Sequence, residues 1–432
     1  MALTRVTYSM ISGSPVNILD FGADPTGTTD SAAAIQAAIN SVKTNGGDIY
    51  IPAGIFRVNS ALDVTGIAAK SVSFIGAGRR TSLIYAYHSG HVFDCTGSQF
   101  LLFQDIGVWG LTPFPQTAFF FARLSTNASA GQNYLNRVQT NGTYTVAAIY
   151  NYAAEEFHMD DCYCTNSYAG AAVLQITRNN IAGLASTFKT VATGNQSTTQ
   201  YDFSGCAFNS YATSGTHGCI QLQGVSAISF TNLFCVNQST TAGASFVWLD
   251  NTTYIQQVMA FNDVMFDGAG ATIGFKLTGT QSWSQIQIAS LLNYSSSITR
   301  MIQADTGSIV QFLNFSNCSN AKEIYIYQAN YCDIENFAAV TVNYYISDSK
   351  ISTNSATYTV SRADFSLNNF VQFYDTNVIN STGSLSISNM AWNVSTFRMG
   401  AYYLWVDGSG RLRIKNGAPA SDTDGTVVGT QT

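Results

Sequence analysis

The sequence predicts an all-β protein built as a parallel solenoid, with one short α-helix near its start and a small β-hairpin region at its end. Three observations predict this fold. A short alternating pattern recurs along the chain, turn-forming residues separate its copies, and few residues are charged. Only 10% of the 432 residues are charged, against about 25% in a typical soluble protein.

The recurring pattern has six positions, with apolar residues at the first, third and sixth and a small polar residue at the fifth. Alternation of period 2 is typical of β-strands. One longer interval, between Phe157 and Tyr201, leaves room for a loop. The copies begin at Val72, Leu101, Phe157, Tyr201, Ile228, Met259, Ile286, Val310, Cys332 and Leu385.

A second alternating strand lies between these copies and begins at Cys219, Phe246, Phe275, Met301 and Glu323. A repeat of two short strands cannot bury its apolar face alone, so successive repeats must stack. Stacking places equivalent residues about 4.8 Å apart. Like charges repel at that distance and neutral polar side chains do not, which explains the low content of charged residues.

One helix is predicted ahead of the repeats, over residues 30–42. Asp30 can cap it, Ile35, Ile39 and Val42 form its apolar stripe, and Asn45-Gly46-Gly47 ends it. We expect this helix to cover the open end of the first coil. At the other end of the chain the repeat fades near Trp392, and the Gly, Asp and Thr clusters that follow predict hairpins and loops.

Composition excludes several classes of protein. A net charge of -6 and a pI near 5.1 give no basic surface for nucleic acid. No apolar run reaches the roughly 18 residues of a membrane span, and the N-terminus lacks the apolar core of a secretory signal. Neither the four histidines nor the eight cysteines show metal-binding spacing, so no metal or cofactor is predicted. We expect free, buried thiols, made in a reducing cytosol.

Two segments resemble a known family. The run NILDFGADPTGTTDSAAAIQAAINSV from Asn17, with GGDIYIPAGIFRVNSAL from Gly46 and SFIGAG from Ser73, resembles the opening of right-handed parallel β-helices of the pectate lyase superfamily, as found in bacteriophage tailspikes. The ending YYLWVDGSGRLRIKNGAPASDTDGTVVGTQT resembles tailspike termini. The resemblance implies a right-handed parallel β-helix that forms a homotrimer on the phage tail and is synthesised in the host bacterial cytoplasm. It also implies binding, and commonly cleavage, of a host surface polysaccharide of the O-antigen or capsule type.

The resemblance also implies a division of the chain into segments. The residues that precede the opening motif are too few for the separate head-binding domain that many tailspikes have. We therefore expect attachment to a phage tail or baseplate protein to use either another phage protein or this short N-terminal segment alone. The opening motif contains no catalytic residue, so cleavage of pectate is not implied. The expected segments are an N-terminal virion-attachment segment (1–16), the capping helix with the first coils (17–70), the parallel β-helix (71–392) and a C-terminal hairpin and trimerisation region (393–432).

Three groups of outward carboxylates are candidate acid and base pairs. Outward residues at i and i+2 lie roughly 6.5 to 7 Å apart, within the separation of the two carboxyl groups of an inverting glycosidase. The first group is Asp333 and Glu335 with Asp364. The alternatives are Glu155, Glu156 and Asp160, with His158 and Asp202 in nearby outward positions, and the pair Asp250 and Asp305.

A group of outward residues on the second strand is the candidate substrate-binding surface: Trp248, Lys276, Gln303, Tyr325 and Tyr327. Aromatic rings suit the apolar faces of sugars, and amides bond their hydroxyls. A trimer interface would bury Trp and Tyr equally well, so both interpretations stay open.

The sequence favours hydrolysis over elimination. A polysaccharide lyase needs a basic proton acceptor and a cation beside a uronate. No arginine occurs between Arg178 and Arg300, and Lys189 and Lys276 are the only lysines in that stretch. Two alternatives remain, a polysaccharide lyase and a non-enzymatic receptor-binding or structural tail spike.

Overall fold

The structure is a computed structural model. It divides into two compact units, Met1–Ser386 and Ile387–Thr432, which we describe separately. The described residues are 14–68, 70–124, 130–179, 183–193, 196, 198–251, 256–279, 282–304, 309–318, 323–337, 339–345, 349–353, 358–360, 371–373, 397–399 and 401–428.

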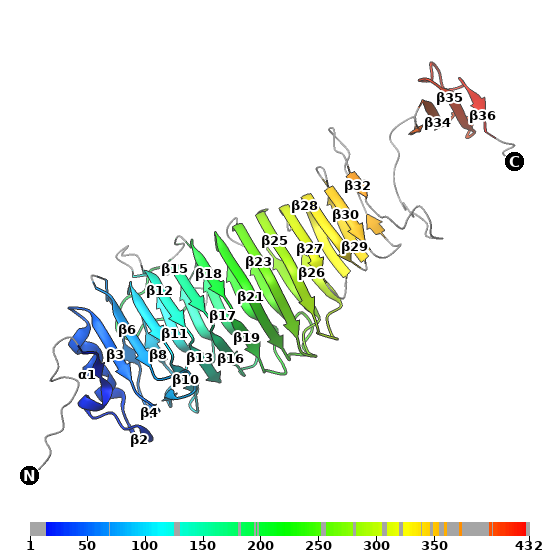
Figure 1. Cartoon of the computed structure of the whole chain (residues 1–432). Helices are drawn as coiled ribbons and strands as arrows, with labels where there is room; N and C mark the ends of the chain where they lie inside the picture. The colour runs from blue at the N-terminus through cyan, green and yellow to red at the C-terminus, as the bar shows by residue number, and fades with distance from the viewer. Residues whose placement is uncertain are drawn as a thin grey trace, which may run out of the picture. The chain divides into compact units, whose positions relative to one another are not determined.

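The first unit is a parallel β-solenoid, as the sequence predicts, with its strands side by side from β3 to β32 (Figure 1). Each coil passes through three sheets, which we call A, B and C. Sheet A contains β1 (Val16–Asn17), β3 (Gly47–Ile51), β6 (Val72–Gly76), β9 (Leu101–Gln104), β12 (Gly131–Asn136), β15 (Glu155–Asp160), β18 (Tyr201–Ser204), the first parts of β21 (Ile228–Asn237), β23 (Gln256–Asp267), β25 (Ser282–Asn293) and β27 (Ile309–Cys318), the second part of β28 (Glu323–Phe337), β30 (Ser349–Thr353) and β32 (Val371–Phe373).

Sheets B and C follow sheet A in each coil. Sheet B contains β2 (Thr26–Asp30), β4 (Gly54–Val58), β7 (Ser82–Ala86), β10 (Gly107–Gly110), β13 (Gln139–Gly142), β16 (Tyr163–Asn166), β19 (Ala207–Ser210) and the second parts of β21, β23 and β25. Sheet C contains β5 (Leu62–Asp63), β8 (His91–Asp94), β11 (Thr117–Ala122), β14 (Ala147–Tyr152), β17 (Ala172–Thr177), β20 (Gly218–Gln223), β22 (Ser245–Asp250), β24 (Ile273–Thr278), β26 (Arg300–Ala304), the first part of β28, β29 (Ala339–Tyr345) and β31 (Tyr358–Val360).

The sequence pattern identified sheets A and C but did not separate sheet B. From β21 onward, sheets A and B are two halves of one bent strand, and a residue with positive φ makes the corner. Asn232, Asp263 and Ser290 occupy this corner position. Asparagine and aspartate adopt the left-handed conformation more readily than most residues, which is why the fifth position of the pattern is small and polar.

Aromatic rings stack along the interior at the spacing of the strands. The rings of Phe203 and Phe230 are parallel with centroids 4.6 Å apart, and those of Phe230 and Phe261 are 5.1 Å apart. These residues are register partners in β18, β21 and β23. One apolar cluster runs through the described coils from Ile18 to Ile324, so the solenoid has a continuous core.

The helix is α1 (Ala32–Val42), which follows the short 3-10 helix η2 (Ile18–Phe21). Ser31 takes the N-cap position, but its side chain makes no capping bond. The adjacent Asp30 carboxylate instead accepts the backbone N–H of Ala32 at 3.0 Å. The buried face of the helix, which includes Ile35 and Ile39, joins the main core. The helix contacts β3 and β5, and Figure 1 shows it beside β3.

A loop segment, which we call the strap (residues 183–193), covers the outer side of sheet C at β8, β11 and β14. The buried Asp94 carboxylate accepts the Ser186 hydroxyl at 2.6 Å and the Thr187 N–H at 3.1 Å. The strap and these strands share a second apolar cluster of Phe120, Ala122, Ala147, Tyr150, Tyr152, Ala153, Leu184, Val191 and Ala192. The strap lies in the long interval of the repeat before Tyr201.

The second unit is an antiparallel sheet, as expected for the C-terminal hairpins. It contains β33 (Phe397–Met399), β34 (Tyr402–Val406), β35 (Leu412–Asn416) and β36 (Thr426–Val427). Its buried Asp407 carboxylate accepts bonds from the guanidinium groups of Arg411 at 3.1 Å and Arg413 at 2.5 Å. These charge-assisted bonds lower the pKa of Asp407.

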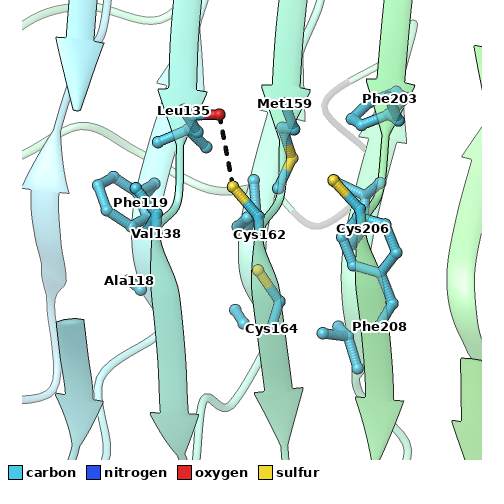
Figure 2. Close-up of a cluster of buried hydrophobic side chains, with 14 of the residues drawn as sticks. Ala118, Phe119, Leu135, Val138, Met159, Cys162, Cys164, Phe203, Cys206 and Phe208 are labelled. Atoms are coloured by element: carbon cyan, nitrogen blue, oxygen red, sulfur yellow. Dashed lines mark hydrogen bonds between the residues drawn. The ribbon is translucent and has the colours of Figure 1, made fainter. Parts of the chain in front are cut away.

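Six cysteines are free and buried, as the sequence predicts: Cys95, Cys162, Cys164, Cys206, Cys219 and Cys235. Figure 2 shows Cys162, Cys164 and Cys206 packed among apolar side chains, with the Cys162 thiol donating to the Leu135 carbonyl at 3.4 Å. Burial raises the pKa values of Cys95, Cys162 and Cys235 well above the usual range. These thiols act as small hydrophobic groups.

We expect the native thiols to be unreactive, because the thiolate is the reactive form and burial disfavours it. A thiol reagent should label these six cysteines slowly in buffer and completely in denaturant, with the labelled peptides identified by mass spectrometry. Rapid labelling of Cys162 and Cys206 in the native protein would contradict the packing shown in Figure 2.

The burial of His91 predicts a solenoid that is less stable in mild acid. Burial beneath the strap lowers the pKa of His91 to about 4, whereas an unfolded histidine titrates near 6.5. The unfolded chain therefore binds more protons between these pH values, so stability falls as the pH drops through this window. We expect the thermal midpoint to fall less between pH 7 and pH 5 in His91→Gln than in the wild type. An equal fall in both proteins would contradict this account.

Candidate functional site

The outer side of sheet A contains a row of mostly polar residues, with one residue from each strand. Tyr134, His158 and Asp202 are register partners on β12, β15 and β18. Their strand neighbours Met159 and Phe203 point into the core. We call this the central row. It continues by register through Ser229, Ala260, Gln287, Asn314, Asp333 and Lys350.

A second outward row lies two residues further along each strand, beside the corner with sheet B. Its members are Gln104, Asn136, Asp160, Ser204, Thr231 and Asn262. Asp160 is half-buried on this row, and Asp202 is exposed on the central row one strand away. Their Cα atoms lie about 8 Å apart, from about 4.8 Å across strands and about 6.6 Å along them.

Four polar residues on three adjacent strands lie close together on the outer side of sheet A. We call Tyr134, His158, Asp160 and Asp202 the sheet A cluster. The rings of Tyr134 and His158 have centroids 6.2 Å apart. The Ser229 hydroxyl donates to the Asp202 carboxylate. Burial, and then the negative charges of Asp160 and Asp202, raise the pKa of Tyr134. Tyr134 is therefore a protonated hydrogen-bond donor at neutral pH.

Two arginines stand at the corner beside this cluster. The Arg137 guanidinium donates two bonds of 2.7 Å to the Asp105 carboxylate. Arg79 donates to the Asp161 carbonyl at 2.5 Å and lies 3.3 Å from its carboxylate. The hydrogen bonds to Asp105, and then the negative charges of Asp105, Asp161 and Asp160, raise the pKa of Arg137. Cations are thus available here, although the sequence stretch between Arg178 and Arg300 contained no arginine.

The structure divides the group Glu155, Glu156 and Asp160. Glu155 lies 3.9 Å from the Arg123 guanidinium and is largely buried. Glu156 has a positive φ of 50°, so it interrupts the strict alternation of β15. Asp160 follows the outward His158 by two residues in a part of the strand where the alternation is regular, so both side chains lie on the outer side. The sequence placed His158 and Asp202 near this group, but it did not identify Tyr134, which lies in a weak copy of the repeat.

Asp333 and Glu335, the first group predicted from the sequence, lie on β28 in sheet A. Asp333 pairs with Asn314 and Lys350 and is therefore on the central row. Six strand steps separate it from His158, or about 29 Å. The two groups therefore cannot form one site within one subunit. Asp364 lies outside the described residues.

The predicted substrate-binding residues Trp248, Lys276, Gln303 and Tyr325 form a single row on sheet C by register, continued backward by Gln221. The structure thus brings four of the five together, and Tyr327 lies two residues further along β28. Asp250 is on the adjacent row, where the Gln223 amide donates to its carboxylate at 3.1 Å. Asp305 lies outside the described residues.

Sheet B presents a different surface, which the sequence reasoning missed. Its outward row is apolar over five consecutive coils. We call this row the sheet B stripe, and Leu292 in it is 43% exposed. The sequence does indicate this stripe: in the strands after the corner, both the inward and the outward positions hold apolar residues. The stripe consists of Tyr163, Ala207, Phe234, Met265 and Leu292.

The described residues contain no group of three or more histidine, cysteine or acidic side chains placed to hold a metal ion. Among them there is also no helix of the length and hydropathy that a membrane crossing requires.

The sequence models of two families match the chain. Residues 121–430 match the family described as capsule depolymerase, which is more than half of the chain. The chain belongs to the capsule depolymerase family. Residues 15–217 match the family described as rhamnogalacturonase A/epimerase, pectate lyase-like. The predicted resemblance to pectate lyase-like β-helices is therefore confirmed.

Individual relatives of this capsule depolymerase family member are distant. A protein named alginate lyase 7 from Azotobacter vinelandii is 42% identical over 72 residues, which is 16% of this chain and 8% of that protein. The A-module of mannuronan C-5 epimerase AlgE6 from the same organism covers 83% of this chain and 99% of its own, at 13% identity and a TM-score of 0.50. The tailspike protein of Acinetobacter baumannii phage AM24 covers 71% of this chain and 55% of its own, at 13% identity and a TM-score of 0.42. The match to the epimerase module shows a shared fold.

Proposed function

We propose that this chain is a phage tailspike depolymerase that cleaves a host capsular polysaccharide by glycoside hydrolysis on the outer side of sheet A. Membership of the capsule depolymerase family supports the substrate. The observation that carries the reaction is the pair Asp160 and Asp202. Their Cα atoms are about 8 Å apart and both side chains stand on the outer side of sheet A, so the two carboxyl groups can adopt the separation of about 6.5 to 9.5 Å that leaves room for a water molecule between an acid and a base.

In this mechanism one carboxyl group protonates the glycosidic oxygen while the other activates a water molecule on the opposite face of the sugar. Asp202 is exposed to solvent and is oriented by the Ser229 hydroxyl, so we assign it as the base. Asp160 is half-buried and is assigned as the acid. Tyr134 and His158 stand beside the pair, where they can bond sugar hydroxyls.

Elimination is the second candidate reaction, and a specific observation favours it. Tyr134 and His158, whose rings are neighbours, can both transfer a proton at a uronate. Arg137 supplies a cation nearby, since the charge of Asp160 contributes to its raised pKa. A lyase needs such a cation beside the uronate carboxylate. The products distinguish the reactions, since hydrolysis releases only saturated reducing ends and elimination also produces unsaturated uronates with ultraviolet absorbance.

We further propose that the protein is a homotrimer held on the virion, with its N-terminal segment bound to a phage tail or baseplate protein. The sheet B stripe supports self-association, because a second copy has the same repeat of about 4.8 Å and can match the stripe row by row. The stripe contains no charged side chain, whereas Lys276 and Asp250 stand on sheet C. Depletion of charge is typical of interface cores.

The catalytic assignment predicts a selective loss of activity. Asp160→Asn and Asp202→Asn should each lower the release of reducing ends from host capsule on the order of 100-fold, with the thermal midpoint little changed. Asp161→Asn is the matched control, because Asp161 is the next residue and its exposed carboxylate faces Arg79 instead. It should retain the wild-type rate.

Other outcomes have clear meanings. If Asp333→Asn or Glu335→Gln abolishes cleavage while Asp160→Asn and Asp202→Asn do not, the site lies on β28 and the assignment to the sheet A cluster is wrong. The pair Asp250 and Asp305 would be tested next. Binding of capsule with neither reducing ends nor unsaturated uronates would show a binding spike, not an enzyme.

The trimer assignment predicts a mass of about three chains by light scattering at micromolar concentration, since three parallel copies can close into a ring with rotational symmetry. Met265→Glu places a charge on the sheet B stripe and should lower that mass. Thr231→Glu, on sheet A of a neighbouring coil, is the control and should not. A wild-type monomer would remove the proposal, and an unchanged mass in Met265→Glu would move the interface to another face.

A further inference from the structure

Lys276 and Trp248 on sheet C form a preorganised cationic feature that the sheet A cluster does not use. The Lys276 ammonium lies 4.3 Å from the centroid of the Trp248 ring. Its other contact is the Gly243 carbonyl, at 3.5 Å. The Trp248 ring is held in turn by the bond of its N–H to the Thr278 hydroxyl at 2.8 Å. Both side chains are therefore fixed before any ligand arrives.

The row positions on either side of this pair hold polar, uncharged side chains. Gln221 precedes Trp248 on the row and Gln303 follows Lys276. The nearby acid Asp250 accepts a bond from Gln223. Arg300 donates to the Gln303 amide oxygen at 3.4 Å and is the register partner of Glu323. The ammonium of Lys276 thus contacts an aromatic ring and a carbonyl, with amides on either side.

This chemistry points to one class of ligand. An ammonium with neutral hydrogen-bonding neighbours suits a carboxylate attached to a group rich in hydroxyls. We propose that the row from Gln221 to Gln303, which we call the sheet C strip, binds the carboxylate-bearing residues of an acidic polysaccharide, with Lys276 contacting the carboxylate. The inference rests on the proposed function in that the ligand is a saccharide.

The sheet C strip is a binding site separate from the catalytic one. It belongs to β20, β22, β24 and β26, whereas the sheet A cluster belongs to β12, β15 and β18 on another sheet. It is also a poor candidate for contact between copies, because lysine and aspartate are depleted in interface cores and sheet B offers an apolar row instead. A bound polysaccharide on this strip would hold the capsule while a different part of it is cut.

The test is binding of two uronate polymers, alginate and hyaluronate, by affinity electrophoresis at low salt. It uses the full chain with Asp202→Asn, so that nothing is cleaved. We expect retardation by at least one polymer, and loss of that retardation when its carboxyl groups are reduced to alcohols. Lys276→Gln should weaken binding on the order of tenfold, because a charge-assisted bond is lost. Lys276→Arg should keep most of it.

Three outcomes would overturn the proposal: no retardation by either polymer, equal retardation by a carboxyl-reduced polymer, or unchanged binding in Lys276→Gln. A change of mass in Lys276→Gln or Trp248→Ala by light scattering would also overturn it, since the strip would then be a contact between copies. Failure of the hydrolase assignment would appear differently, as capsule cleavage that is absent or insensitive to Asp160 and Asp202 while this binding persists.

Discussion

The spacing of parallel strands, about 4.8 Å, is the constraint on which the rest of this structure depends. Every side chain has an equivalent at that distance in the coils before and after it. Inside, this spacing lets the rings of Phe203, Phe230 and Phe261 stack. Outside, it disfavours runs of like charge, so neutral side chains dominate the rows. A charged residue on an outer row is therefore an exception, and the candidate sites are identified from such exceptions.

The three outer surfaces follow from this constraint in different ways. Sheet A combines carboxylates with a tyrosine and a histidine in adjacent coils, an arrangement suited to acid and base chemistry. Sheet B keeps an apolar stripe, which suits association with another copy. Sheet C is covered by the strap over β8, β11 and β14 and presents the Trp248 and Lys276 pair further along. Each surface can change without disturbing the core, because alternate residues of each strand face opposite ways.

Much of this arrangement could be predicted from the sequence because it depends on local alternation. The phase of each strand places Trp248, Lys276 and Gln303 on the same side, and the register confirms that they form one row. Sheet B could not be separated, because its corner with sheet A is a single left-handed residue such as Asn232. The neighbouring outward positions of His158 and Asp202 could be predicted even though the strap lies between their strands, because the copies of the pattern at Phe157 and Tyr201 align. Glu156 disturbed the phase of its own strand by its positive φ.

The central claim is that the polysaccharide is cut on sheet A between Asp160 and Asp202. The most direct test is a crystal structure of the Asp202→Asn variant with a capsule oligosaccharide that spans the scissile bond. We predict that the linkage lies across β15 and β18, with its oxygen within hydrogen-bond distance of Asp160. An oligosaccharide whose scissile linkage lies beside Asp333 and Lys350, or on sheet C beside Asp250, would contradict the account.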